Sequence, residues 1–234
     1  VWHDPFQMQP PLPDYNVFAL SQWQQQRLYS YQKVNAMVFD PHCGVPEDEC
    51  GSNSALGQYF IYIGRAHPTK GMLQAAIDCK KLGVGLKIIG SLGPGDDPLY
   101  MEKVRALCDG SIELLSNVSE RSKNMLIANA LALIYPINYP KESGEAHSHK
   151  TVDSLLMGTP VIAYNQGALS EVVEHGVDGF LANTAEEFQQ YMSMASKLDR
   201  GLIRTRATQR WGVDEVVKNA MGLLTEVARG KQWS

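Results

Sequence analysis

The sequence lacks the long apolar segment that a membrane-spanning helix requires. No apolar run of about 18 residues occurs in its 234 residues, and no segment has the apolar core of a signal peptide. An excess of basic residues is also missing, because 21 Lys and Arg stand against 25 Asp and Glu and leave a net charge of −4. We therefore expect no membrane span, no nucleic-acid partner, and a cytoplasmic location, either free or peripheral at a membrane.

Cysteine is scarce, and the four residues show neither CxxC spacing nor the density of a disulfide scaffold. Cys79 and Cys108 fall within helical patterns and are interpreted as buried thiols. Cys43 and Cys50 flank a loop, and they would pair only in an oxidising compartment. The chain also begins at Val1 without an initiator methionine, so we expect a fragment, a processed chain or a trimmed one.

No internal repeat of about 20–50 residues occurs, but from Gln58 onward apolar strands alternate with amphipathic helices. Strands are expected at 59–63, 86–89, 112–115, 131–135, 161–163 and 180–181. Helices are expected at 70–82, 98–108, 119–128, 149–157, 169–175, 185–198 and 204–228. This alternation predicts an α/β fold, a doubly wound, Rossmann-like parallel sheet with helices on both faces. A ligand is expected at the carboxyl ends of the strands.

The beginning of the chain has a different character. The first 15 residues contain four prolines and no periodicity, which is typical of a connector. A strand at 16–20, a helix at 21–31 and a strand at 34–39 follow, and then a Pro-, Gly- and acid-rich loop at 41–54. We predict a domain boundary in this loop, with residues 1–45 on one side and 46–234 on the other.

Two clusters of residues that suit a phosphate ligand follow the first predicted strands of the larger part. Arg65 and Lys70 lie within Gly64–Gly71, where a turn opens a helix, and this combination suits a diphosphate. Taken alone, the two cations are as readily explained as surface charges. The glycine-rich turn 90–95 follows the next strand and would let the backbone approach a ligand closely, although such turns also occur without one.

A third cluster, within residues 136–160, combines acids with a helix start. Glu145 precedes the helix and is suited to accept hydrogen bonds from hydroxyl groups, as sugars offer, while free amides of the Ser148–Lys150 turn would face a phosphate. The alternative for Glu145 is an acid that compensates the helix dipole. His147 and His149 suggest a metal pair, but no third ligand is spaced to complete it, and we expect no metal site.

A fourth cluster, residues 165–171, is a glycine turn that leads into a helix. Glu171 lies in the first turn of that helix, which by itself is ordinary capping chemistry.

In this order and at this spacing, the four clusters resemble the carboxyl-terminal domain of family 4 glycosyltransferases, which have the two-domain GT-B fold. The resemblance spans about residues 58–182 and rests on Tyr62–Arg65 with Lys70–Gly71, Lys87–Gly90, Tyr135–Pro136, Glu145-x7-Asp153, Gly158–Ala163, Gly167 with Glu171, and Gly176 with Gly179–Leu181. Val17–Gln24 resembles the last strand and helix of the family's amino-terminal domain, which makes residues 1–45 a remnant of the acceptor-side domain with its linker. Arg210–Val213 and the helix after it resemble the family's closing helix.

The resemblance implies retaining transfer of a sugar from a nucleoside diphosphate donor, with no cofactor and no obligatory metal. It assigns Arg65 and Lys70 to the departing diphosphate and Glu145 to hydroxyls of the donor sugar, and these three are the candidate catalytic residues. The candidate donor-binding residues are Gly64, Gly90, Asn117, Val118, Ala146, His147, Ser148, His149, Lys150 and Asp153. Among them, 117–118 would lie near the base, 146–150 at the phosphates and Asp153 at the ribose.

The sequence departs from the family pattern in three ways. Asp153 stands where the family has Glu, and His147-Ser148 stands where it has Phe-Gly, so the phosphate loop has lost a glycine's freedom. Most of the acceptor domain has no counterpart, so the acceptor is unknown (a sugar, lipid or protein), and a separate acceptor domain or a second copy is the expected partner. The alternative functions are a non-catalytic nucleotide-sugar-binding module and a nucleotide-sugar epimerase-like protein, which would need acids from both domains.

Overall fold

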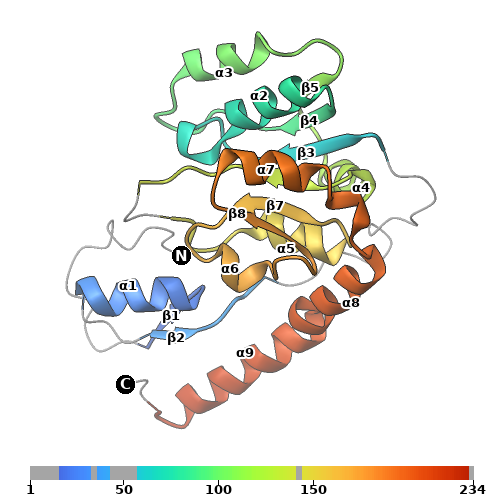
Figure 1. Ribbon diagram of the computed structural model, residues 1–234. Helices are drawn as coiled ribbons and strands as arrows, with labels where there is room; N and C mark the ends of the chain where they lie inside the picture. The colour runs from blue at the N-terminus through green and yellow to red at the C-terminus, as the bar shows by residue number, and fades with distance from the viewer. Residues whose placement is uncertain (1–15, 33–35, 43–56, 141–143, 232–234) are drawn as a thin grey trace.

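The computed structural model describes residues 16–32, 36–42, 57–140 and 144–231, which form two separate parallel sheets (Figure 1). The larger sheet has the strand order β5-β4-β3-β6-β7-β8. Its strands are β3 (Tyr59–Ile63), β4 (Gly85–Ile89), β5 (Ile112–Leu115), β6 (Leu133–Tyr135), β7 (Val161–Tyr164) and β8 (Gly179–Ala182). The sheet extends outward from β3 to β5, returns to the other side of β3 with β6, and ends at β8. The strand order therefore reverses between β3 and β6, where doubly wound sheets bind their ligands.

Helices cover both faces of the larger sheet. They include α2 (Met72–Leu82), α3 (Pro98–Arg105), α4 (Glu120–Asn129), α5 (His149–Leu156), α6 (Leu169–Val172), α7 (Ala185–Met192) and α8 (Arg200–Trp211). α9 (Val213–Ala228) follows α8 and extends away from the sheet (Figure 1). α2 and α7 lie side by side on one face, where Gln189 Nε2 donates to Asp78 Oδ1 at 2.8 Å. α4, α5 and α8 pack together on the other face (Figure 1). Because both faces are covered, β6 and nearly all of β7 are buried, as their unbroken apolar runs predict.

The predicted doubly wound sheet is confirmed, but several predicted helices end differently. The expected helix at 204–228 is two helices, α8 and α9, because the backbone at Gly212 is extended (φ −60°, ψ 147°) and interrupts the helix. A Cβ at Gly212 would also lie only 2.5 Å from the Thr208 carbonyl oxygen. The helix expected at 169–175 ends at Val172, because the Asp178 carboxylate binds the Glu174 amide and starts a turn. The helix expected at 185–198 ends at Met192 and is followed by a short 3₁₀ helix, Ala195–Lys197.

The smaller sheet is a β-α-β unit at the beginning of the described chain. β1 (Val17–Ala19) pairs in parallel with β2 (Ala36–Val38), and α1 (Gln22–Gln32) connects them. The carboxylate of Glu171, in α6, accepts hydrogen bonds from the Gln22 and Trp23 amides at 2.8 and 2.7 Å. Glu171 therefore caps the start of α1. The carboxyl terminus returns to this unit, where Asn16 Nδ2 donates to the Lys231 carbonyl at 3.2 Å.

Two expectations concern residues outside the described ranges, namely the domain boundary at 45/46 and the pairing of Cys43 with Cys50. The burial expected for the other cysteines is confirmed for Cys79, while Cys108 is only half-buried. No helix within the described ranges has the length and apolar character needed to cross a membrane.

Candidate functional site

The candidate site lies at the carboxyl ends of β3 and β6, where the strand order reverses. A 3₁₀ turn, Pro68–Lys70, follows β3 and ends at Gly71, which has a left-handed φ of 78°. A Cβ at Gly71 would lie 1.9 Å from the Pro136 carbonyl oxygen, so only glycine allows the loop after β3 to pack against the loop after β6. This packing brings Lys70 next to Glu145, with Lys70 Nζ 2.7 Å from Glu145 Oε2.

Glu145 is a buried carboxylate surrounded by donors. Lys70 Nζ, Tyr135 OH and Tyr139 OH all donate to its Oε2 atom, and no described residue is found donating to Oε1. Burial alone would raise the pKa of Glu145, but the charges of Lys70 and Lys150 outweigh it and hold the pKa below its ordinary value. Glu145 in turn raises the pKa of Lys70 against the opposing effect of burial. The pair is therefore ionised at neutral pH.

Lys150 adds a second cation beside this carboxylate. It lies in the first turn of α5, with Nζ 4.0 Å from the centre of the Tyr135 ring. Burial lowers the pKa of Lys150 to about 8, although Glu145 acts in the opposite direction. Lys70 and Lys150 together carry one positive charge more than Glu145, and the amino-terminal end of α5 adds its partial positive charge. The surroundings of Glu145 thus suit an anion.

The loop before α5 does not need the glycine that the family pattern places there. Ser148 is the N-cap of α5 with φ −128°, an ordinary extended conformation, and its Oγ atom lies 2.6 Å from Thr151 Oγ1. The required freedom lies elsewhere, at Gly167, where φ is 62° and a Cβ would lie 2.4 Å from the Glu145 carbonyl oxygen. The third and fourth clusters are joined there, since the Ala168 amide donates to the same carbonyl at 2.8 Å.

Arg65 joins the first cluster to the second rather than to Glu145. Its side chain is about half exposed, and Nε lies 3.3 Å from Asp96 Oδ2 in the turn after β4. Gly64 and Gly90 face each other between these loops, because a Cβ at Gly90 would lie 2.6 Å from the Gly64 carbonyl oxygen. The packing of the two loops thus explains the lack of a side chain at Gly90, while a Cβ at Gly64 would lie 2.8 Å from the Tyr62 hydroxyl.

The remaining predicted residues lie at the same edge of the sheet. Asn117 and Val118 follow β5, next to β4, and Asn117 is exposed with a left-handed φ of 54°, which asparagine tolerates better than most residues. Ala146 is buried directly after Glu145. Asp153, in α5, accepts a hydrogen bond from His42 Nε2 at 2.7 Å.

His42 was not predicted as part of any site. It follows β2, yet one ring nitrogen from each of His42, His147 and His149 lies within 4.8 Å of the others. Our expectation that no third ligand completes the His147–His149 pair is therefore wrong. Burial lowers the pKa of His147 to about 4, so its ring is neutral at physiological pH.

A hollow of about 480 Å³ opens beside this edge, between the loops after β3, β6 and β7. Its lining includes Gly71, Pro136 and Gln166 but none of the predicted donor residues. The candidate site is therefore defined by the loop ends around Glu145 rather than by this hollow.

The model of one protein family, described as glycosyl transferases group 1, matches residues 57–197, from β3 to the turn after α7. The matched segment contains Lys70, Glu145, Lys150 and Asp153. The chain belongs to this family. The predicted resemblance to the carboxyl-terminal domain of a GT-B glycosyltransferase is thereby confirmed. None of the curated proteins compared with the chain matches it.

Solved structures of glycosyltransferases share the fold. A glycosyltransferase from Rickettsia africae ESF-5 is 19% identical with a TM-score of 0.73, and the alignment covers 94% of this chain and 65% of that one. AviGT4, a glycosyltransferase involved in avilamycin A biosynthesis, is 19% identical with a TM-score of 0.70, covering 93% and 64%. Anabaena Alr3699/HepE, solved in complex with UDP and glucose, is 19% identical with a TM-score of 0.68, covering 90% and 62%. The chain thus spans less than two thirds of the length of these structures.

Proposed function

We propose that this chain binds a nucleoside diphosphate sugar at the carboxyl ends of β3 and β6 and is the donor half of a retaining GT-B glycosyltransferase. The observation that carries the proposal is the buried Lys70–Glu145 ion pair at the reversal of strand order, with Lys150 beside it. The carboxylate would accept hydrogen bonds from the hydroxyl groups of the donor sugar, and the two ammonium groups would stabilise the negative charge of the phosphates.

Lys70 and Lys150 are the groups that would stabilise the leaving diphosphate. Cleavage of the bond to the sugar places additional negative charge on the phosphate oxygens, and fixed cations and helix amides stabilise that charge in the transition state. An ammonium group has three N–H donors, so Lys70 keeps its bond to Glu145 while it contacts a phosphate oxygen. The half-exposed Arg65 would reach the diphosphate by exchanging its Asp96 partner for a phosphate.

Glu145 is the group that would bind the sugar. Its three observed hydrogen bonds end on Oε2, and Oε1 would accept the hydroxyl of a donor sugar. Asp153 would bind the ribose, and residues 117–118 would lie near the base. UDP is the first nucleotide to test, because the similar Alr3699/HepE structure contains it.

The proposal needs no metal ion at the diphosphate, because side-chain cations and a helix terminus already supply positive charge there. We expect that chelation with EDTA, and addition of Mg²⁺ to the chelated chain, both leave UDP affinity within about twofold, a change of under about 0.5 kcal/mol. A requirement for Mg²⁺ or Mn²⁺ in a calorimetric titration would contradict this part of the account.

A transfer assay tests the proposed activity and its alternative, a binding module without transfer. Holding the acceptor hydroxyl against the reacting carbon accounts for several kcal/mol of barrier, and in a GT-B enzyme that surface belongs to the other domain. The chain would be incubated with labelled nucleotide sugars and an acceptor panel, with and without a separately expressed acceptor domain. We expect donor binding without transfer by the chain alone, and transfer when the cleft is rebuilt. Robust transfer by the isolated monomer would show that the chain is not half of a site.

A further inference from the structure

Three histidines from two distant segments meet next to the proposed donor site. His42 comes from the segment after β2, while His147 and His149 flank Ser148 at the start of α5. Ring centroids are 4.9 Å apart for His42 and His149, 4.7 Å for His147 and His149, and 6.1 Å for His42 and His147. Nothing in the proposed binding of a nucleotide sugar explains why three imidazoles gather here.

The most buried of the three has an unsatisfied nitrogen. His147 is only 4% exposed, and its Nε2 atom has no hydrogen-bond partner among the described residues. Asp40 Oδ1 lies 3.4 Å from this atom but makes no hydrogen bond with it. A buried polar atom without a partner costs free energy, and coordination of a cation would satisfy it.

Two carboxylates lie next to the histidines, Asp153 beside His42 and Asp40 beside His147. Asp153 Oδ1 lies 2.7 Å from His42 Nε2, and a bond donated by Nε2 leaves Nδ1 of that ring for a metal. Asp40 lies beside His147 and is itself fixed, because Trp211 Nε1 donates to its Oδ2 at 2.8 Å and the His42 amide to its Oδ1 at 3.0 Å. A carboxylate bonded to the second ring nitrogen, as Asp153 is for His42, orients the ligand ring and increases its basicity. Asp40 lies instead beside the Nε2 atom of His147, so its negative charge would lie next to the ion itself.

We propose that His42, His147 and His149 bind one divalent transition-metal ion of the zinc type. Three imidazole nitrogens form one of the common zinc ligand sets and leave a fourth tetrahedral position for water or another ligand. Imidazole favours zinc, copper and nickel over the hard cation Mg²⁺. The nitrogens must draw closer than 4.8 Å around such an ion, and His149, which is exposed, can do so by a change of rotamer.

The ion would connect two parts of the chain that lie far apart in the sequence. His42 belongs to the segment that leaves the smaller sheet, and the other two ligands belong to the loop that starts α5. Binding of the ion would therefore fasten this segment to the proposed phosphate loop and stabilise the folded chain by mass action. The proposal stands on the histidines alone and does not depend on the proposed nucleotide-sugar function.

Cobalt and zinc titrations of a chelator-treated chain without a histidine tag test the proposal. Tetrahedral Co²⁺ absorbs visible light intensely, so we expect a band that saturates at one Co²⁺ per chain and disappears when Zn²⁺ is added. Zn²⁺ should raise the melting temperature, and Mg²⁺ should not. His42→Gln and His149→Gln should each weaken Zn²⁺ binding more than tenfold, whereas His67→Gln, outside the cluster, should leave it unchanged.

A chelated chain that shows no saturable Zn²⁺ binding, or that binds Zn²⁺ equally well after His42→Gln and His149→Gln, has no metal site at these residues. Both variants keep the buried His147, and circular dichroism of each reports whether it is folded. UDP titration of the chelated wild-type chain, with and without Zn²⁺, separates a failure of this proposal from a failure of the donor site.

Discussion

At the scale of single residues, the balance of charge around Glu145 governs the proposed donor site. Lys70 and Glu145 could be singled out from the sequence because each stands in a recognisable motif in the loop after a strand, and the structure brings the two together. Their role at a donor stays a prediction. The hydroxyls of Tyr135 and Tyr139 could not, because a tyrosine at a strand end has no partner until the loops after β3 and β6 meet. His42 is the extreme case, since its segment has no periodicity and its neighbours in space lie over a hundred residues away in the chain.

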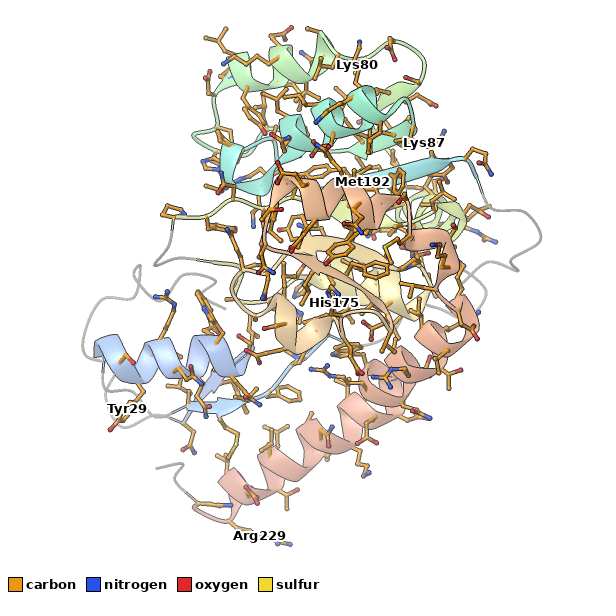
Figure 2. All side chains as sticks on the ribbon, viewed as in Figure 1. Tyr29, Lys80, Lys87, His175, Met192 and Arg229 are labelled. Atoms are coloured by element: carbon orange, nitrogen blue, oxygen red, sulfur yellow. The ribbon has the colours of Figure 1, made fainter. Side chains whose placement is uncertain are left out.

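Lys70→Ala should weaken UDP binding about tenfold to a hundredfold, because a charge-assisted hydrogen bond contributes about 1.5–3 kcal/mol. Uridine, which lacks phosphates, should bind as before. The matched control is Lys87→Ala, whose side chain lies over the Tyr59 ring at the opposite, amino-terminal end of β3 (Figure 2). Equal losses for UDP and uridine in calorimetric titrations would mean that Lys70 only supports the fold by pairing with Glu145.

Lys150 should make UDP binding pH-dependent. Its pKa of about 8 lies below the ordinary value, so the free chain loses this charge as the pH rises through 8, whereas a bound diphosphate favours the charged form. Binding then takes up a proton above pH 8, and affinity should fall with rising pH by up to about tenfold per unit. Ionisation of the ligand itself affects the wild-type chain and Lys150→Met equally. The additional fall in affinity above pH 8 should therefore be absent from Lys150→Met. An identical pH profile in both chains would exclude Lys150 from the phosphate site.

At the scale of elements, the strands could be predicted well and the helix ends less well. Apolar runs located β3, β4 and β5 to within a residue, because helices on both faces leave few polar positions in them. The division of the last helix at Gly212 was missed, since helical patterning continues on both sides of that glycine. Glu171 was interpreted as a cap of its own helix, but it caps α1, and such a contact depends on how distant segments pack.

Glu171→Ala should destabilise the docking of α1. The carboxylate satisfies two amides at the start of α1, and loss of a helix cap costs about 0.5–2 kcal/mol. For a chain of this size we expect the melting temperature to fall by about 2–4 °C for each kcal/mol lost. Glu174→Ala removes a surface ion pair with Arg206 and should change little. Equal effects of the two substitutions in thermal unfolding would show that the α1 cap contributes nothing.

At the scale of the whole molecule, a larger sheet with the fold of a GT-B carboxyl-terminal domain lies next to the small β1-α1-β2 unit (Figure 1). The small β1-α1-β2 unit and α9 lie together at one side of the larger sheet (Figure 1). Val213, Val217, Met221 and Leu224 are each more than half exposed and recur at helical spacing along α9. An acceptor domain or a second copy of the chain would complete the cleft, and this partner stays a prediction.

The measurement that tests the central claim most directly compares uridine, UDP and UDP-glucose in calorimetric titrations of the wild-type chain and Glu145→Gln, with GDP and ADP run in parallel. The account predicts that one nucleoside diphosphate binds with a stoichiometry of one, and that its sugar conjugate binds too. Glu145→Gln should impair the nucleotide sugar more than the bare diphosphate, while Asp153→Asn should impair both, because the ribose is common to them. A wild-type chain that binds none of these nucleotides would contradict the account. So would a Glu145→Gln chain that simply unfolds, since Glu145 would then be a structural acid at a helix start.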